Sequence, residues 1–177
     1  MSETFQIITR FFHGESLASI LKGQGNRESD RTITDIYNYN DKQLEEDHSF
    51  IQWIFPTPRL SAFNRNAPIL TKQDITMLKS DPTVMEWLNL FKYKMFTYWG
   101  IENKDFSQCK ILKGHNGLRL SRAIECLTFF GIDIVTDLLV IDEFITLGIL
   151  KPEMELYQGQ MTPVWFIRYK QAIANRS

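Results

Sequence analysis

The chain has 177 residues, of which 44% are hydrophobic and 23% charged, and its formal net charge is −1. This length and apolar content predict one folded domain over residues 1–177 and exclude disorder for most of the chain. The near-zero charge argues against a protein that coats nucleic acid through gross charge. No apolar run approaches the ~20 residues of a membrane span, and the polar start Met1–Thr4 excludes an ordinary secretory signal. We therefore expect a soluble, cytoplasmic protein.

Helix signals follow one another through the first half of the chain. The predicted elements are a helix over 4–12 ending near Gly14, a further turn over 16–21, a surface loop over 23–31, and a short helix through Ile36 and Tyr37 capped by Thr32 or Thr34. A helix over 42–54, capped by Asn40 and Asp41, an extended proline-containing connection over 56–70, and a helix over 72–79 with a capping box of Thr71 and Asp74 complete this half.

The second half continues in the same way. Asp81 and Pro82 begin a long helix that Gly100 closes. Helices follow over 117–130, with Asn116 as N-cap and Gly131 at the end, and over about 134–147. The first of these carries an apolar stripe of Leu120, Ile124 and Leu127. Residues 154–158 are the one plausible hairpin arm, and Thr162 and Pro163 begin a last helix over about 163–174. The fold class predicted is all-α, a single-domain irregular bundle of about seven or eight helices.

One polar block surrounds His48. On a continuous helix His48 lies on the apolar stripe, with Gln52 one turn later on the same face. A histidine there acts as a base, a metal ligand or a hydrogen-bonded core group, and base rates favour the core group. Trp53 is more typical of a core anchor than of a stacking platform.

A second polar block opens the helix after Gly114. His115, Arg119 and Arg122 share one helix face beside Asn116, so two guanidiniums meet the positive end of a helix and make a corner suited to phosphate or carboxylate. The competing interpretation is structural, in which Arg119 and Arg122 pair with Glu45, Glu46 or Asp47 and lock two helices together.

Charge is segregated around this second block. Residues 104–122 carry five cations and one acid, a net +4, whereas residues 123–156 carry one cation and seven acids, a net −6. The basic stretch includes Lys104, Lys110 and Lys113, and the acidic stretch after it argues against a broad nucleic-acid footprint.

Several chemistries have no motif here. The sequence has no P-loop, nucleophile elbow or zincin motif, and its three histidines are too scattered to propose a metal site, so we expect no cofactor, no metal and no catalytic residue. Cys109 and Cys126 are expected to be two reduced thiols, with one disulfide as the alternative.

The residues of the first block also carry a family resemblance. Residues 44–56 read Leu-Glu-Glu-Asp-His-Ser-Phe-Ile-Gln-Trp-Ile-Phe-Pro and resemble the most distinctive motif of the opioid growth factor receptor conserved domain. The further similar segments, in the family's order, are residues 30–36, residues 62–71, Phe96–Gly100 and residues 115–122. The resemblance covers about residues 5–150, and Ser49 stands where the family motif usually has an acid.

This resemblance implies a fold more than a function. In animals the family is known as the N-terminal part of a receptor for an enkephalin peptide, and it also occurs as stand-alone bacterial proteins. Because the long repeat-bearing tail of the animal protein is missing, the chain resembles a stand-alone, bacterial-type member. The family has no assigned catalytic mechanism, and fold does not fix function.

Our leading hypothesis is a non-catalytic binding module. Its polar pocket takes a small anion or an acidic peptide and is lined by His48, Gln52, Trp53, His115, Asn116, Arg119 and Arg122. One alternative is an enzyme that uses His48 or His115 as the acid–base residue. Another is an interaction scaffold that contacts a protein partner through exposed aromatic residues or the basic C-terminal helix.

Overall fold

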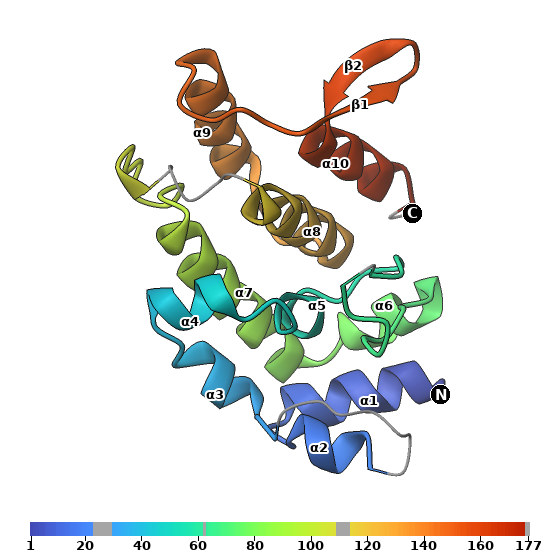
Figure 1. The fold of residues 1–177 in the computed structure, drawn as a ribbon. Coiled ribbons are helices and arrows are strands. Elements are labelled where there is room, and N and C mark those ends of the chain that lie inside the picture. Colours follow the sequence, from blue (N-terminus) through green and yellow to red (C-terminus); the bar gives the residue numbers. More distant parts are fainter. Residues whose placement is uncertain (23–29, 62, 109–113, 176–177) are drawn as a thin grey trace. The chain divides into compact units, whose positions relative to one another are not determined.

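Most of the chain is helical. The computed structural model describes residues 1–22, 30–61, 63–108 and 114–175, which form ten helices and one two-stranded sheet (Figure 1). A mostly helical fold is therefore confirmed. The all-α class and the count of seven or eight helices hold only approximately, because these residues form ten helices and a small sheet. Residues 1–91 and 92–177 form two compact units, and the single domain over 1–177 stays a prediction.

The described residues of the first unit form six helices and the beginning of a seventh. They are α1 (Glu3–Phe12), α2 (Leu17–Ile20), α3 (Ile33–Tyr37), α4 (Asp41–Glu46), α5 (Ile51–Ile54), α6 (Lys72–Leu78) and the start of α7 (Pro82–Tyr98). Thr32, Asn40 and Thr71 cap α3, α4 and α6 through capping boxes, so these predicted starts are confirmed. The predicted surface loop over 23–31 lies mostly outside the described residues.

The helix predicted over 42–54 is wrong, because the chain leaves the α region between α4 and α5. Asp47 ends α4 with an extended backbone, and its Oδ1 accepts hydrogen bonds from the amide and the hydroxyl of Ser49 at 2.7 and 2.8 Å. An aspartate that bonds the backbone two residues on competes with helix continuation. His48 is therefore exposed on this turn instead of lying on an apolar helix stripe.

Aromatic side chains make much of the core of the first unit. Trp53 is fully buried, as predicted for a core anchor, and its ring centroid lies 5.7 Å from that of Phe11. Tyr37 contacts the rings of Trp87 and Phe91 edge-on, with centroids 5.6 Å apart in both pairs. These contacts attach the short helices α3 and α5, which are too short to be stable alone, to longer elements.

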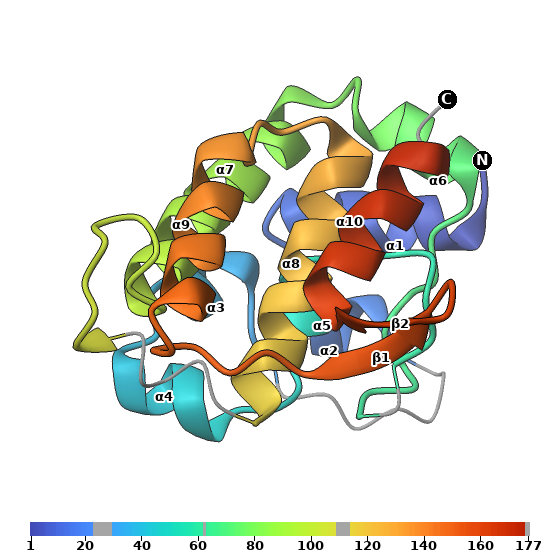
Figure 2. The ribbon, with the colours of Figure 1, turned by 90° about the horizontal axis from the view of Figure 1, so that it is seen from above.

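The second unit holds the rest of α7 with α8 (His115–Phe130), α9 (Val135–Thr146), the strands β1 (Met154–Tyr157) and β2 (Gln160–Pro163), and α10 (Val164–Asn175). Gly100 and Gly131 follow α7 and α8 with positive φ, as predicted. In both views α10 lies beside α8 (Figures 1 and 2). The buried Leu120, Ile124 and Leu127 form the predicted stripe of α8.

Two starts in this unit differ from prediction. α8 begins at His115, because Gly114 adopts a positive φ and serves as the N-cap, so the prediction of Asn116 as N-cap is wrong. β1 confirms the hairpin arm, and it pairs antiparallel with β2. Thr162 and Pro163 belong to β2, so the last helix begins after them at Val164.

Among the described residues, no helix is both long and apolar enough to span a membrane.

The capping box of α6 offers a test of burial. Asp74 is buried, and its Oδ2 accepts hydrogen bonds from the amide and hydroxyl of Thr71 at 2.8 and 2.7 Å, while its Oδ1 accepts one from the Ser2 hydroxyl. We expect Asp74→Ala to lower the free energy of unfolding by about 1–3 kcal/mol in urea titrations followed by circular dichroism, because buried donors lose their acceptor.

The control is Asp35→Ala. Asp35 accepts the corresponding hydrogen bonds from the amide and hydroxyl of Thr32, but at the exposed start of α3. Water replaces the lost acceptor there, so this variant should be destabilised less. An equal or larger loss for Asp35→Ala would contradict the role given to burial.

Candidate functional site

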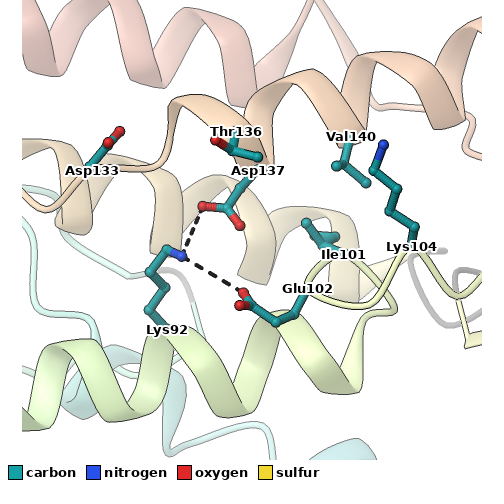
Figure 3. A pocket seen from close by; sticks show the side chains of 8 residues that line it. All are labelled: Lys92, Ile101, Glu102, Lys104, Asp133, Thr136, Asp137 and Val140. Atoms are coloured by element: carbon teal, nitrogen blue, oxygen red, sulfur yellow. Dashed lines mark ion pairs between the residues drawn. The ribbon is translucent and has the colours of Figure 1, made fainter.

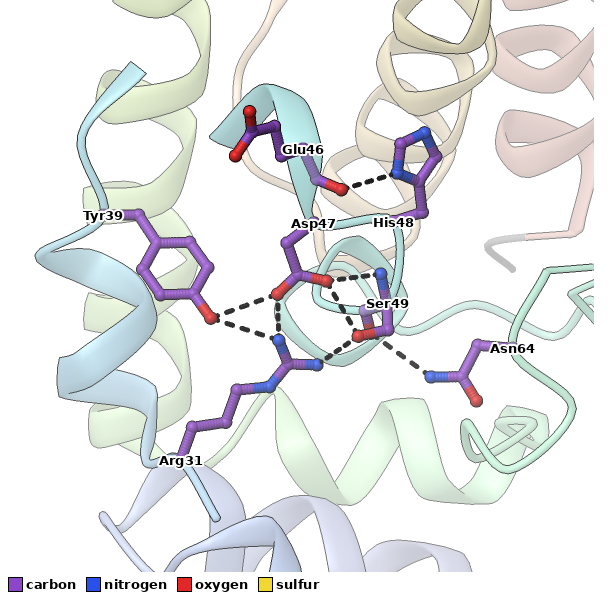
Figure 4. Close-up of polar contacts among 7 residues, drawn as sticks. All are labelled: Arg31, Tyr39, Glu46, Asp47, His48, Ser49 and Asn64. Carbon is purple, nitrogen blue, oxygen red and sulfur yellow. Dashed lines mark hydrogen bonds and ion pairs between the residues drawn. The ribbon is translucent and has the colours of Figure 1, made fainter. Parts of the chain in front are cut away.

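A buried guanidinium organises the turn between α4 and α5. Arg31 is only 5% exposed. It forms an ion pair with Asp47 and donates from Nη1 to the Tyr39 hydroxyl at 3.1 Å and from Nη2 to the Ser49 hydroxyl at 2.7 Å (Figure 4). The Nδ2 of Asn64 donates to the Ser49 carbonyl at 3.2 Å, which connects the network to the segment after α5.

The acceptors of this network are fully used. Oδ1 of Asp47 accepts the two hydrogen bonds from Ser49, and Oδ2 accepts from Arg31 and from the Tyr39 hydroxyl at 3.1 Å. Partial burial by itself raises the pKa of Asp47, but the Ser49 hydrogen bonds and the Arg31 charge outweigh burial and leave that pKa below its usual value. Burial raises the pKa of Tyr39. The network therefore holds a charged Asp47 in the folded chain.

The network joins three of the segments that carry the family resemblance. Arg31 comes from residues 30–36, Asp47 and Ser49 from residues 44–56, and Asn64 from residues 62–71. Sequence reasoning passed over Arg31, since an arginine sixteen residues from its carboxylate leaves no periodic signal. The sequence signal for Arg31 was its position in residues 30–36, a segment that resembles the family.

The three predicted site residues of the first unit have separate environments. The Nδ1 of His48 lies 2.9 Å from the Glu46 carbonyl oxygen, and its ring is exposed (Figure 4). Gln52 is buried, and its Nε2 donates to the Ser61 hydroxyl at 3.1 Å. Because His48 is not on a helix with Gln52, the predicted shared face of these two residues is wrong. Trp53 lies in the core.

The four predicted site residues of the second unit share the beginning of α8. Asn116 and Arg119 are buried, and Arg119 donates from Nη1 to the Asn116 Oδ1 at 3.2 Å. His115 and Arg122 are half-buried, and helical spacing sets both on the same face as Arg119. Burial lowers the pKa of Arg122, while Cys126 and Glu125 act in the opposite direction.

The predicted seven-residue pocket takes members from both units. His48, Gln52 and Trp53 belong to the first, and His115, Asn116, Arg119 and Arg122 to the second, so their meeting in one pocket stays a prediction. Cys109, Lys110 and Lys113 lie outside the described residues. Cys126 is a buried thiol without a disulfide among the described residues, and burial raises its pKa, which makes it a poor nucleophile.

A pocket that sequence reasoning missed lies in the second unit. It has a volume of about 310 Å³ and is bordered by α7, the turn after it and α9 (Figure 3). Its lining residues are Lys92, Ile101, Glu102, Lys104, Asp133, Thr136, Asp137 and Val140. Lys92 Nζ lies 2.9 Å from Asp137 and 3.8 Å from Glu102, and it stands 5.5 Å from the centre of the Phe96 ring.

This pocket is polar and of mixed charge. Two lysines face three carboxylates there, and Lys104 also pairs with Glu143 at 3.4 Å, so the lining does not favour an anion. Within the described part of the chain, no group of three histidine, cysteine or acidic side chains is arranged to hold a metal ion. The ion pairs of Lys92 connect three segments and have an evident structural role.

Comparison with known proteins gives one family. The model of the "Opioid growth factor receptor (OGFr) conserved region" matches residues 21–171. The opioid growth factor receptor of Mus musculus is 30% identical over 104 residues, which are 51% of this chain and 16% of the mouse protein. That of Homo sapiens is 28% identical over 104 residues, 51% of this chain and 15% of the human protein. The match thus spans about a sixth of these relatives. No solved structure matches the chain.

The depressed pKa of Asp47 predicts how stability depends on pH. Its carboxylate is favoured by folding, so this stabilisation is complete above the ordinary aspartate pKa of about 4 and is lost as the pH falls through the lower pKa of the folded state. We expect Asp47→Asn to lower the free energy of unfolding by about 2–4 kcal/mol at pH 7, because Arg31 stays buried without its anion. The difference from wild type, measured in urea titrations, should shrink toward pH 3.

The matched control is Asp30→Asn, a change at an exposed carboxylate next to Arg31 in sequence. Its stability should follow wild type at every pH. A pH-independent loss in Asp47→Asn would mean that shape, and not charge, accounts for the effect.

Lys92 provides a second comparison of buried with exposed charge. Lys92→Ala leaves Asp137, which is 90% buried at its side chain, without its cation, and should lower the free energy of unfolding by about 1–3 kcal/mol. Lys104→Ala breaks an exposed pair with Glu143 and should leave the urea midpoint nearly unchanged. Equal effects of the two variants would contradict this difference.

Proposed function

This chain belongs to the opioid growth factor receptor conserved-region family, and we propose that it is a binding module for anionic ligands. The proposed ligand is a carboxylate of an acidic peptide or a phosphate group. The proposed site is the face of α8 that carries His115, Arg119 and Arg122. The matched relatives are named as receptors for a growth factor, a name that agrees with binding as the activity.

The observation that supports this site is a pair of arginines withdrawn from water on one helix face. Arg119 is buried and oriented by Asn116, while Arg122 one turn later is half-buried. Removing a guanidinium from water costs free energy, and its pKa falls accordingly. A nearby anion offsets that cost, a role to which the charge of Glu125 contributes and to which the anionic ligand adds in this proposal.

The chemistry of the face suits an oxyanion. Guanidiniums bind carboxylate and phosphate through paired hydrogen bonds in a fixed plane. Arg119 and Arg122 are the fifth and eighth residues of α8, and the helix dipole adds positive potential at the first turn before them. His115 in the first turn supplies a ring nitrogen beside them. In this proposal Arg122 and His115 contact the anion, and Arg119 is a positioning residue behind them.

The contacts around His48 give less support to acid–base catalysis. The two oxygens of Asp47 accept hydrogen bonds from Arg31, Tyr39 and Ser49, and the His48 ring bonds to the Glu46 carbonyl. A catalytic histidine is commonly oriented by a carboxylate, and Asp47 is engaged in holding the turn.

Thermal unfolding with added anions tests the proposal. The probes are inorganic phosphate, sulfate and an acetylated tetraglutamate peptide, compared at constant ionic strength. A ligand that binds the folded chain stabilises it by mass action and so raises Tm. At a free ligand concentration of ten times the Kd, the free energy of unfolding rises by about 1.4 kcal/mol. We expect at least one probe to raise the Tm of wild type and to lose this effect in Arg122→Gln.

The control is Arg168→Gln, which removes a half-buried arginine from α10 in the same unit. This variant should keep the full shift. If no probe raises the wild-type Tm, or if Arg122→Gln keeps the shift, α8 is not an anion site.

A further inference from the structure

The connection between α5 and α6 closes on itself as a loop over residues 57–70. Thr57 and Ile69 form a β-bridge, and the Leu70 amide donates to the Thr57 carbonyl at 3.2 Å. The two ends of the loop therefore lie side by side. Compact loops with adjoining ends, packed by their own side chains, frequently carry function.

Buried polar side chains fix the path of this loop. The Ser61 hydroxyl accepts hydrogen bonds from Gln52 Nε2 and from the amides of Phe63 and Asn64, each at 3.1 Å. Asn64 reaches the Ser49 carbonyl with Nδ2 and accepts from the Asn66 amide at 3.0 Å with Oδ1. The loop is thus attached to α5 and to the turn held by Arg31. Ala62 lies outside the described residues.

The same loop presents apolar side chains to solvent. Leu60 is 63% exposed, Phe63 67% and Ile69 42%. Buried hydrogen bonds fix the backbone around Phe63, so the loop holds its conformation while these side chains face solvent. An exposed apolar group on a preorganised loop is typical of a binding surface, since little conformational entropy is lost when a partner covers it.

The charged side chains of the loop and its flanking residues have one sign. From His48 to Gln73 the sequence contains Arg59, Arg65 and Lys72 and no aspartate or glutamate. Arg65 and Lys72 are exposed, so a partner that covers the loop meets cations close in sequence to Phe63 and Ile69. Complementarity then requires acidic residues interspersed with apolar ones.

We propose that residues 57–61 and 63–70 of this loop form a docking surface for an acidic protein segment that also carries aliphatic or aromatic side chains. The exposed apolar groups extend from Phe63 in the middle of the loop to Ile69 at its base. A loop that inserts into a membrane gathers such groups at its tip, so this spread favours a peptide laid along the loop. The surface belongs to the first unit, and the proposed site on α8 belongs to the second.

Selection from a phage-displayed library of random dodecapeptides on the full chain tests this assignment. The selected peptides should be enriched in aspartate and glutamate next to leucine, isoleucine or aromatic residues. A synthetic copy of one selected peptide should bind wild type in fluorescence anisotropy. We expect Phe63→Ser and Arg65→Glu each to weaken that binding about tenfold or more.

The matched control is Leu139→Ser, because Leu139 on α9 is 66% exposed, nearly as much as Phe63. This variant should bind as wild type does, and so should Arg122→Gln, which separates this surface from the α8 site. Circular dichroism melting checks that Phe63→Ser folds, as expected for a change at an exposed position.

Three results would overturn the proposal. The first is selection of peptides without acidic enrichment, and the second is equal binding of the selected peptide to wild type and Phe63→Ser. The third is Phe63-dependent binding to phosphatidylserine vesicles in the absence of peptide selection, which would identify a lipid surface as the partner.

Discussion

A guanidinium withdrawn from water must be surrounded by acceptors, and Arg31 imposes that requirement on the first unit. It finds its acceptors in Asp47, Tyr39 and Ser49. Arg31 holds Asp47 and Ser49 at the turn where α4 ends. The chain then continues into α5, which carries the buried Trp53. The Ser49 carbonyl then receives Asn64, which fixes the loop over residues 57–70. One buried cation thereby sets a local break, a core anchor and an exposed surface.

The cations of the second unit divide between structural and binding roles. Lys92 is held between Asp137 and Glu102, so its charge is largely balanced and serves to connect α7 with α9. Arg119 and Arg122 lie on a single face of α8, and the side-chain amide of Asn116 accepts a hydrogen bond from Arg119. The difference in their surroundings, and not the residue type alone, makes α8 the better candidate for an anionic ligand.

The segments that mark the family contribute unequally to these features. His48, within the most distinctive motif, lies exposed on a turn, whereas its neighbours Asp47 and Ser49 are engaged in the Arg31 network. Arg31 and Asn64, from two other resembling segments, complete the same network. Much of the family pattern therefore describes how the first unit folds, and this explains why membership in the family does not by itself identify a ligand.

Local chemistry in the sequence determined the helix starts at Thr32, Asn40 and Thr71, the glycine ends at Gly100 and Gly131, and the apolar stripe of α8, because caps and stripes act within one or two turns. Tertiary structure decided the ion pair of Asp47, whose guanidinium partner is sixteen residues away, and the pocket around Lys92, whose carboxylates come from two other segments. It also decided that Leu60 and Phe63 face solvent. Such features depend on contacts between distant residues, and residue spacing contains no record of them.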